Sequence, residues 1–172
     1  MSFEGVIRDI DWTIEPEKIQ SLTDGYIEDT RKKINQIAKV PEGKETLQTL
    51  LDFEESTSAL GDLARPFIFM KDISTDKAQR DAGNDVEKKV LKFFNEIGGR
   101  KDLYDVFKRL VAVTDTFGPE EQMLLKRTLE AFVHKGAALD NDKRKEFLEI
   151  SNNVTVLESD YNRVYNEEIT TV

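Results

Sequence analysis

The chain has 172 residues, enough for one domain or two small ones with a real hydrophobic core. It carries 25 basic and 34 acidic residues, for a formal net charge of −9, and no basic tract, which argues against binding to nucleic acid or anionic membrane. Its apolar runs are too short to span a bilayer, and it has no cysteine and so no disulfide, which fits a reducing compartment. Because Met1–Glu4 also lacks the pattern of a signal peptide, we expect a cytoplasmic protein.

Helix-breaking residues are few and lie between periodic segments. The 9 glycines and 4 prolines separate long stretches with apolar residues at helical spacing, and alternating patterns typical of strands are nearly absent. The sequence therefore predicts an all-α fold, a bundle of about six helices with long antiparallel pairs. We expect one helical domain over residues 1–172, divided into an N-terminal arm (1–14), a first helical pair (15–65) and a four-helix portion (74–169).

The first helical pair is bounded by prolines. Pro16 suits a first helical turn, and Pro41-Glu42-Gly43 indicates the turn after the first helix. The second helix is predicted over about 44–63, because the residue before Pro66 disfavours the helical conformation, and 67–73 would be a connector. In the arm, Trp12 and Ile14 are expected to pack onto the helices.

The third helix is predicted after three candidate capping residues, Ser74, Thr75 and Asp76. Gly98-Gly99 indicates a left-handed stop at its end. The expected buried stripe of this helix contains Ala78, Ala82, Val86, Val90, Phe93, Phe94 and Ile97.

Two shorter helices should follow. The fourth is predicted over about 101–116 and the fifth over about 119–135, with Gly118-Pro119 between them and Gly136 as the end of the fifth. The residues expected to point inward from the fourth helix are Leu103, Phe107, Leu110 and Val111.

The sixth and longest helix, capped by Asp140 or Asn141, has the most regular apolar pattern. Its apolar residues are separated by steps of 3, 4, 3, 4 and 3, which is a heptad seam over about two and a half repeats. This pattern fits either an antiparallel helix pair inside one bundle, which we favour, or an intermolecular coiled coil. Val156 and Tyr165 lie off the seam and suggest a second covered face. The seam consists of Phe147, Ile150, Val154, Leu157, Tyr161 and Val164.

No residue pattern marks a catalytic, metal-binding or cofactor-binding site. The single histidine, His134, falls in the last turn of a predicted helix, where a protonated imidazole interacts well with the helix dipole. Adjacent carboxylates such as Glu120-Glu121 point about 100° apart on a helix and are typical of solvated helix ends. We therefore assign no catalytic, cofactor-binding or metal-binding residue in this chain.

Four segments, in the same order along the chain, resemble the N-terminal helical region of the thimet oligopeptidase–neurolysin–oligoendopeptidase family of zinc metallopeptidases. The first has Arg80-Asp81-Ala82 followed by Glu87-Lys88-Lys89-Val90, and the second is Arg100-Lys101-Asp102-Leu103-Tyr104. The similarity is clearest over about 67–169 and weaker elsewhere. The other two segments are Leu129–Leu139 and Lys145–Glu168.

The resemblance implies an all-helical piece that forms part of one wall of a deep channel. In the family, two histidines and a glutamate hold zinc, and the glutamate of a His-Glu-x-x-His motif is the general base. All of these belong to a C-terminal part, and this chain contains no such motif. We therefore expect no cofactor and no peptidase activity here, with zinc only in a full-length relative.

Three interpretations of the function remain open. The chain is the N-terminal part of an oligopeptidase, a stand-alone helical interaction or regulatory module derived from that family, or an unrelated helical bundle. The partners expected are peptide substrate or a C-terminal catalytic part, together with a second copy of the chain through exposed apolar surface.

Overall fold

A computed structural model describes residues 10–167, which are entirely helical apart from the connecting loops. The all-α prediction, with about six helices, is confirmed, and a short 3-10 helix is added. No helix within 10–167 is long and apolar enough to cross a membrane. The elements are α1 (Pro16–Ile37), α2 (Leu47–Ile73), α3 (Lys77–Gly98), α4 (Lys101–Leu110), η1 (Val111–Thr116), α5 (Pro119–His134) and α6 (Asn141–Glu167).

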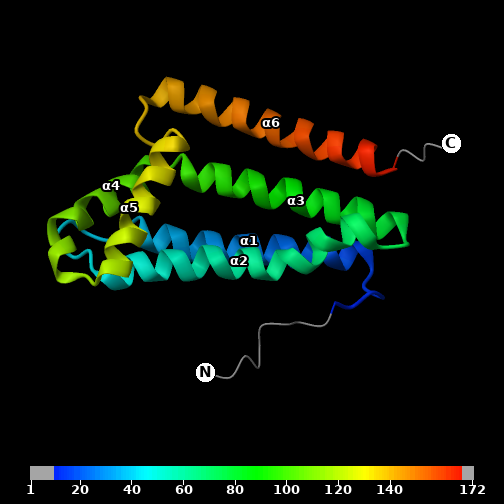
Figure 1. Cartoon of the computed structure of the whole chain (residues 1–172), viewed down its shortest axis with the longest axis horizontal. Coiled ribbons are helices and arrows are strands. Elements are labelled where there is room, and N and C mark those ends of the chain that lie inside the picture. Colours follow the sequence, from blue (N-terminus) through cyan, green and yellow to red (C-terminus); the bar gives the residue numbers. More distant parts are fainter. Residues whose placement is uncertain (1–9, 168–172) are drawn as a thin grey trace.

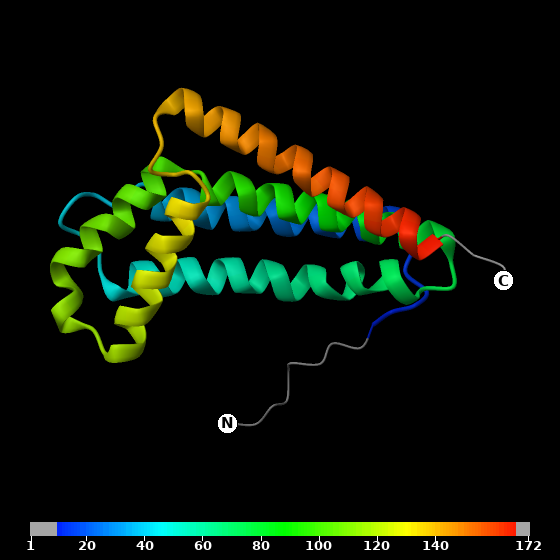
Figure 2. The same cartoon turned by 45° about the horizontal axis from the view of Figure 1, so that its top comes forward.

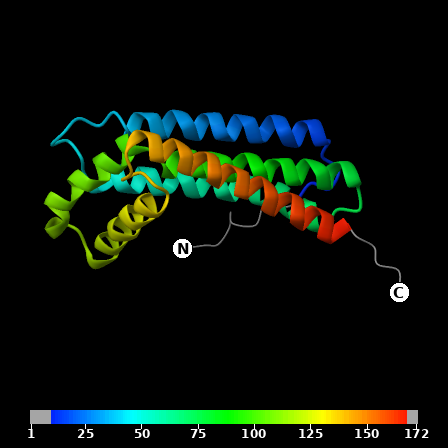
Figure 3. The same ribbon diagram turned by 90° about the horizontal axis from the view of Figure 1, so that it is seen from above.

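Three long helices form the body of the molecule, and the rest is added at one end and along one side. Helices α1, α2 and α3 all pack against one another, and α6 packs on α3. The shorter α4, η1 and α5 gather at one end of the bundle, while α6 runs back along its outer edge (Figures 1 and 2). Seen from above, α6 lies over α3 along most of its length (Figure 3).

The core is divided into two clusters of buried apolar side chains. One joins α1, α2, α3, α4 and α5, and contains an aromatic group in which the rings of Phe53 and Phe107 meet edge to face at 4.9 Å. Phe132 of α5 completes that group, with its ring 5.5 Å from that of Phe107. The other cluster lies between α1, α2 and α3 around Ile19 and Val86, both fully buried. Neither cluster includes a residue of α6.

Helix α2 does not stop at Pro66, as the sequence predicted, but continues to Ile73. The predicted connector over 67–73 is therefore wrong. A proline inside a helix costs about 3 kcal/mol, because it removes one backbone hydrogen bond and its ring crowds the preceding turn. Continuing the helix buries Met70 almost completely and packs Phe67 and Ile68 against the second cluster. Full burial of a side chain such as Met70 contributes about 1.5–3 kcal/mol, and the partly buried Phe67 and Ile68 add to this, so that together they offset the proline.

The extended part of α2 approaches α3 very closely at Gly83. A Cβ atom added there would lie 2.6 Å from the carbonyl oxygen of Phe67 and 2.9 Å from the backbone nitrogen of Lys71. Only glycine fits between the two backbones without moving one of them. The contact therefore depends on α2 remaining helical beyond Pro66.

The bounds of α3 are as predicted, but the backbone conformation at its end is not. Asp76 is the N-cap, and its side chain accepts a hydrogen bond of 2.8 Å from the backbone N–H of Ala78. The left-handed stop predicted at Gly98-Gly99 is wrong, because Gly99 has an ordinary φ of −83°. Gly98 instead provides space for the side chain of Lys135, whose Cγ would lie 2.7 Å from an added Cβ. Gly136 does end α5 as predicted, and it is there that a glycine takes the left-handed conformation, with φ +83°.

The predicted fourth helix is divided into two. Regular α-helix ends at Leu110, and Val111–Thr116 continue as the 3-10 helix η1. Leu103, Phe107 and Leu110 are fully buried, as expected, but Val111 is 53% exposed. A 3-10 helix has fewer residues per turn than an α-helix, so Val111 no longer lies on the inward face that the sequence pattern predicted for it.

The described part of the N-terminal arm is fixed by one side chain of α3. The side-chain amide of Gln79, itself buried, donates to the backbone carbonyls of Trp12 at 2.9 Å and Ile14 at 3.0 Å. Ile14 packs against the second cluster, as predicted, whereas the Trp12 side chain is about half exposed. Residues 1–9 of the predicted arm lie outside the described residues, as do 168 and 169 at the end of the predicted four-helix portion.

Candidate functional site on helix α6

The structure brings no catalytic group together around His134. This residue is the last of α5, as predicted, and its side chain is exposed. Among residues 10–167, no three histidine, aspartate or glutamate side chains are close enough together to hold a metal ion. The arrangement of helix α6 is the most unusual feature of the molecule, and it was not foreseen from the sequence.

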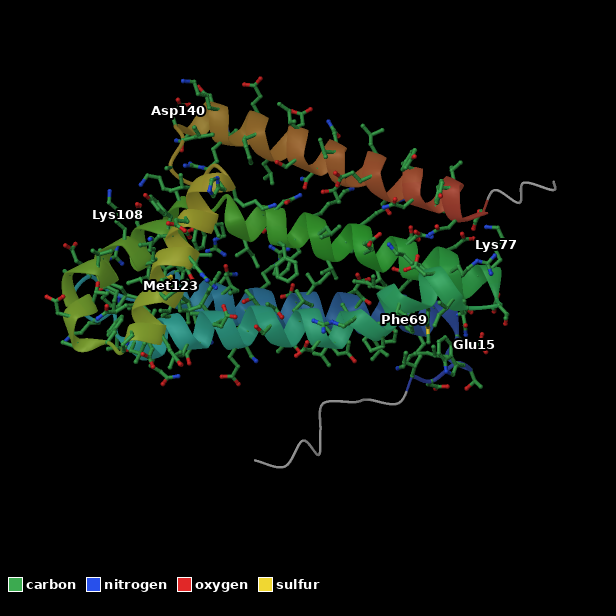
Figure 4. The ribbon with its side chains drawn as sticks, viewed as in Figure 1. Glu15, Phe69, Lys77, Lys108, Met123 and Asp140 are labelled. Atoms are coloured by element: carbon green, nitrogen blue, oxygen red, sulfur yellow. The ribbon has the colours of Figure 1, made fainter. Side chains whose placement is uncertain are left out.

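Helix α6 starts at a capped end and runs antiparallel to α3. The carboxylate of Asp140 accepts a hydrogen bond of 2.9 Å from the backbone N–H of Lys143, which confirms Asp140 as the capping residue. Lys77, at the start of α3, lies 3.7 Å from Glu167 at the end of α6. Figure 4 shows the two ends of α6, with Asp140 at its start and Lys77 close to its other end.

A buried asparagine of α3 is the centre of the contact with α6. The side-chain amide of Asn95 donates to Thr155 at 3.1 Å and to Asn152 at 3.3 Å. Its carbonyl oxygen accepts a bond of 2.9 Å from Lys135, which follows α5. Thr155 and Ser159 are the buried residues of α6, and both are polar. Because buried polar groups stabilise a structure only when they are satisfied, this network fixes the position of α6 on α3.

Charged pairs extend the same contact toward the end of α6. Lys88 of α3 donates to Asp160 at 2.6 Å, and this hydrogen bond, opposed by slight desolvation, lowers the pKa of the Asp160 carboxyl below its ordinary value. Nearby, Glu87 pairs with Lys71 of α2 at 2.6 Å and accepts a long hydrogen bond of 3.4 Å from Ser159. From Asn152 to Glu167, the inner face of α6 is therefore held by hydrogen bonds and ion pairs.

Beyond Phe147, which is half-buried, the apolar seam of α6 points away from the bundle. Ile150 is 55% exposed, Leu157 68%, Tyr161 69% and Val164 59%. The antiparallel pair inside one bundle exists, but the expectation that the seam forms it is wrong. The reason is that α3 presents Asn95, Glu87 and Lys88 to α6, and these groups require polar partners rather than an apolar stripe. In Figure 4, side chains along the outer edge of α6 project away from the other helices.

A second periodic pattern in α6 could have indicated its inner face. Asn152, Thr155, Ser159 and Asn166 also follow helical spacing, on the side opposite the seam. Polar residues at this spacing are usually assigned to solvent, and so this face was not recognised. The off-seam Val156 is partly buried, as the sequence suggested, but Tyr165 is 70% exposed and stacks on Tyr161 at 6.3 Å.

The surface also has hollows, one of them at the end of α6. A polar hollow of about 410 Å³ between the ends of α2 and α6 and the start of α3 is lined by Lys71, Lys77, Arg80 and Arg163, together with acidic residues. Three of these cations are within 4.0 Å of a carboxylate, and Arg80 donates to the backbone carbonyl of Ser74. A more apolar hollow of about 380 Å³ lies between α2, α3 and α5, around Phe53, Phe94 and Leu124. Neither combines groups that would perform chemistry.

Comparison with known proteins relates the chain to oligopeptidases. A "Thimet-like oligopeptidase" of Dictyostelium discoideum is 23% identical over 145 residues, which is 81% of this chain and 22% of that protein. "Saccharolysin" of Saccharomyces cerevisiae is 22% identical over 163 residues, 91% of this chain and 22% of that protein. The chain is distantly similar to thimet-like oligopeptidases. No family model matches it.

The similarity covers most of this chain but only a small part of each relative. The chain spans about a fifth of the length of each of the two relatives, although most of the chain is matched. The similarity thus concerns the helical bundle as a unit and supports the relation that the four sequence segments indicated. It assigns no functional residue within the chain.

Proposed function

We propose that this chain is the non-catalytic helical part of a zinc-dependent oligopeptidase and forms one wall of its substrate channel. The observation that carries the proposal is the similarity to two oligopeptidases over 81% and 91% of the chain. The rigid layer of α1, α2 and α3 would supply a stable wall. Zinc, the general base and peptide cleavage would belong to a catalytic part outside these 172 residues, and the assembled enzyme would act in the cytoplasm.

The proposal predicts that the chain alone cleaves no peptide. The measurement is hydrolysis of an internally quenched peptide, with zinc content determined on the same sample. We expect no metal-dependent cleavage, because the sequence has one histidine and no cysteine and so lacks the usual ligands of a catalytic zinc. Stoichiometric tightly bound zinc together with metal-dependent cleavage would overturn the assignment as a non-catalytic part.

The source gene tests the relation to a catalytic part directly. Sequencing past the codon for Val172, in all forward frames, should reveal a His-Glu-x-x-His motif in the same or a shifted frame. An unrelated gene in that place would contradict the proposal that the chain belongs to a complete oligopeptidase.

A second function is favoured by a different observation, the exposed seam of α6. A helix that turns its regular apolar face to solvent is typical of a surface that binds another helix. On this alternative, the chain is a stand-alone interaction or regulatory module derived from the oligopeptidase family. An unrelated gene after Val172, combined with self-association through α6, would favour this alternative.

A further inference from the structure

The outer face of α6 is a continuous apolar stripe with no counterpart in the described bundle. Six of its side chains are at least 45% exposed, and the rings of Tyr161 and Tyr165 stack on one another at its C-terminal part. Isolated exposed apolar residues are normal, but a contiguous stripe of several hundred Å² usually marks a binding surface. The six residues are Ile150, Val154, Leu157, Tyr161, Val164 and Tyr165.

The stripe has the spacing of a helix that pairs with another helix. Steps of 3 and 4 keep the seam facing the partner in a pair of supercoiled helices. In the heptad notation abcdefg, position a is occupied by Val154 and Tyr161, and position d by Ile150, Leu157 and Val164. The polar face that contacts α3 lies on the opposite side of α6, so the bundle does not obstruct the seam. We propose that the α6 seam binds the α6 seam of a second copy of this chain, in a parallel two-helix contact.

The charges beside the seam favour the parallel orientation. In a parallel pair, each g position faces the e position five residues later in the partner helix. None of these three pairings joins two like charges, and each joins a carboxylate to a side chain that can donate a hydrogen bond. The pairings are Glu146 with Ser151, Asn153 with Glu158 and Asp160 with Tyr165.

The antiparallel orientation is disfavoured by the same residues. With the seams centred on each other, g positions then face g positions, which places Glu146 of each copy opposite Glu167 of the other. Both like-charge contacts would lie at the ends of the pair and would repel. The acidic edges also argue against an anionic lipid surface as the occupant of the seam.

The exposed area is close to what a specific dimer needs. The six side chains present on the order of 600 Å² per copy, near the ~800 Å² that each partner contributes to a standard interface. A contact at this small end of the range should give a reversible dimer with a Kd on the order of micromolar. The chain would therefore be a mixture of monomer and dimer in ordinary preparations.

Sedimentation equilibrium of the whole chain over about 1–200 µM tests the contact. We expect the average mass to rise from the monomer mass of 19.7 kDa toward twice that value. Leu157→Lys and Tyr161→Lys should weaken dimerisation at least about tenfold, because each places a charge in the seam. Circular dichroism should show the same helix content in both variants, since both side chains are solvent-exposed in the monomer.

Met123→Lys is the matched control. Met123 is 46% exposed on α5, away from α6 (Figure 4), so its replacement should leave dimerisation unchanged. A monomer throughout the concentration range would overturn the proposal, as would a dimer that both seam variants leave intact. Either result would leave the proposed relation to oligopeptidases untouched, because that relation is tested by cleavage and by the gene.

Cysteine cross-linking tests the orientation, and the absence of native cysteine makes it simple. In the parallel dimer, the two copies of an Ile150→Cys variant bring their thiols side by side, and mild oxidation should give a covalent dimer. In the antiparallel dimer, position 150 faces position 161 of the partner. Efficient cross-linking between an Ile150→Cys copy and a Tyr161→Cys copy, with none between two Ile150→Cys copies, would overturn the parallel arrangement.

Discussion

Helix α3 contacts its neighbours through two faces with opposite chemistry. Toward α1 and α2 it presents Val86, Val90 and Phe93, all nearly inaccessible to solvent. Toward α6 it presents Lys88 and Asn95, which bind through hydrogen bonds and an ion pair. Apolar burial contributes about 1.5–3 kcal/mol per side chain, whereas a typical hydrogen bond contributes a net ~0.5–1.5 kcal/mol. The three-helix layer therefore supplies most of the stability, whereas α6 is positioned precisely but held more weakly.

The largest effect should come from the apolar face. Phe93→Ala removes a ring that packs in the core and lies under Arg31, with 4.7 Å between the guanidinium carbon and the ring centroid. We expect the free energy of unfolding to fall by about 3–5 kcal/mol in urea denaturation. Leu91→Ala on the same helix, where Leu91 is 41% exposed, is the control and should cost much less. Equal losses in the two variants would contradict the assignment of this face to the core.

The close contact of α2 with α3 gives the next prediction. Gly83→Ala forces a methyl group against the α2 backbone and should destabilise the protein by about 1–3 kcal/mol, despite the better helix propensity of alanine. Gly61→Ala is a matched control within α2, because no atom lies within 4 Å of the added Cβ. That control should be neutral or stabilising by up to about 1 kcal/mol. Thermal or urea unfolding of both variants would show whether α2 is a close-packed helix beyond Pro66.

The polar face should respond less strongly. Asn95→Ala leaves Thr155 and Lys135 without their α3 partner, and we expect a loss of about 1–2 kcal/mol. Hydrogen exchange should show the loss mainly as faster exchange in α6, because α1, α2 and α3 keep their own contacts. Glu149→Ala, at an exposed position of α6 outside both the seam and the contact with α3, is the control and should change little. A uniform increase in exchange across the whole bundle would show that α6 is not a separately held element.

The smallest effect is a dependence on pH. The hydrogen bond from Lys88 lowers the folded-state pKa of Asp160, so its contribution to stability is present above the ordinary carboxyl pKa and is lost as the pH falls through the lowered value. The difference in unfolding midpoint between the wild type and Lys88→Met should therefore shrink below about pH 4. A difference that stays constant from pH 7 to pH 3 would contradict a role for this pair.

The sequence predicted those parts of the fold in which apolar periodicity leads directly to burial. The stripe of α3 over 82–97 and the inward residues Leu103 and Phe107 of α4 lie where the pattern indicated. Ala78, the first residue of the expected stripe, is instead exposed, because Gln79 is the residue that turns inward at the start of α3. The pattern failed at Pro66 because local backbone preference was outweighed by the burial of Met70, which depends on a helix distant in sequence. Tertiary contacts of this kind leave no local signal.

The candidate site was less predictable than the fold, for a related reason. The heptad seam of α6 was recognised, but its direction depended on the polarity of the facing side of α3, above all on Asn95. An apolar stripe indicates that a surface is suited to burial, not which surface covers it. Single residues such as Thr155 and Ser159, buried on the opposite face, decide the orientation.

A disulfide between α3 and α6 tests directly which face of α6 packs against the bundle. In the double variant Asn95→Cys/Thr155→Cys, two side chains that now meet at 3.1 Å are replaced in a chain with no other cysteine. Mild oxidation should give an intramolecular disulfide at all protein concentrations, detected by mass and by mobility on a non-reducing gel, whereas Asn95→Cys/Val154→Cys should not. A disulfide in the Val154 variant and none in the Thr155 variant would mean that the apolar seam faces α3. That result would contradict the orientation of α6 in which Thr155 packs on α3 and the seam faces solvent.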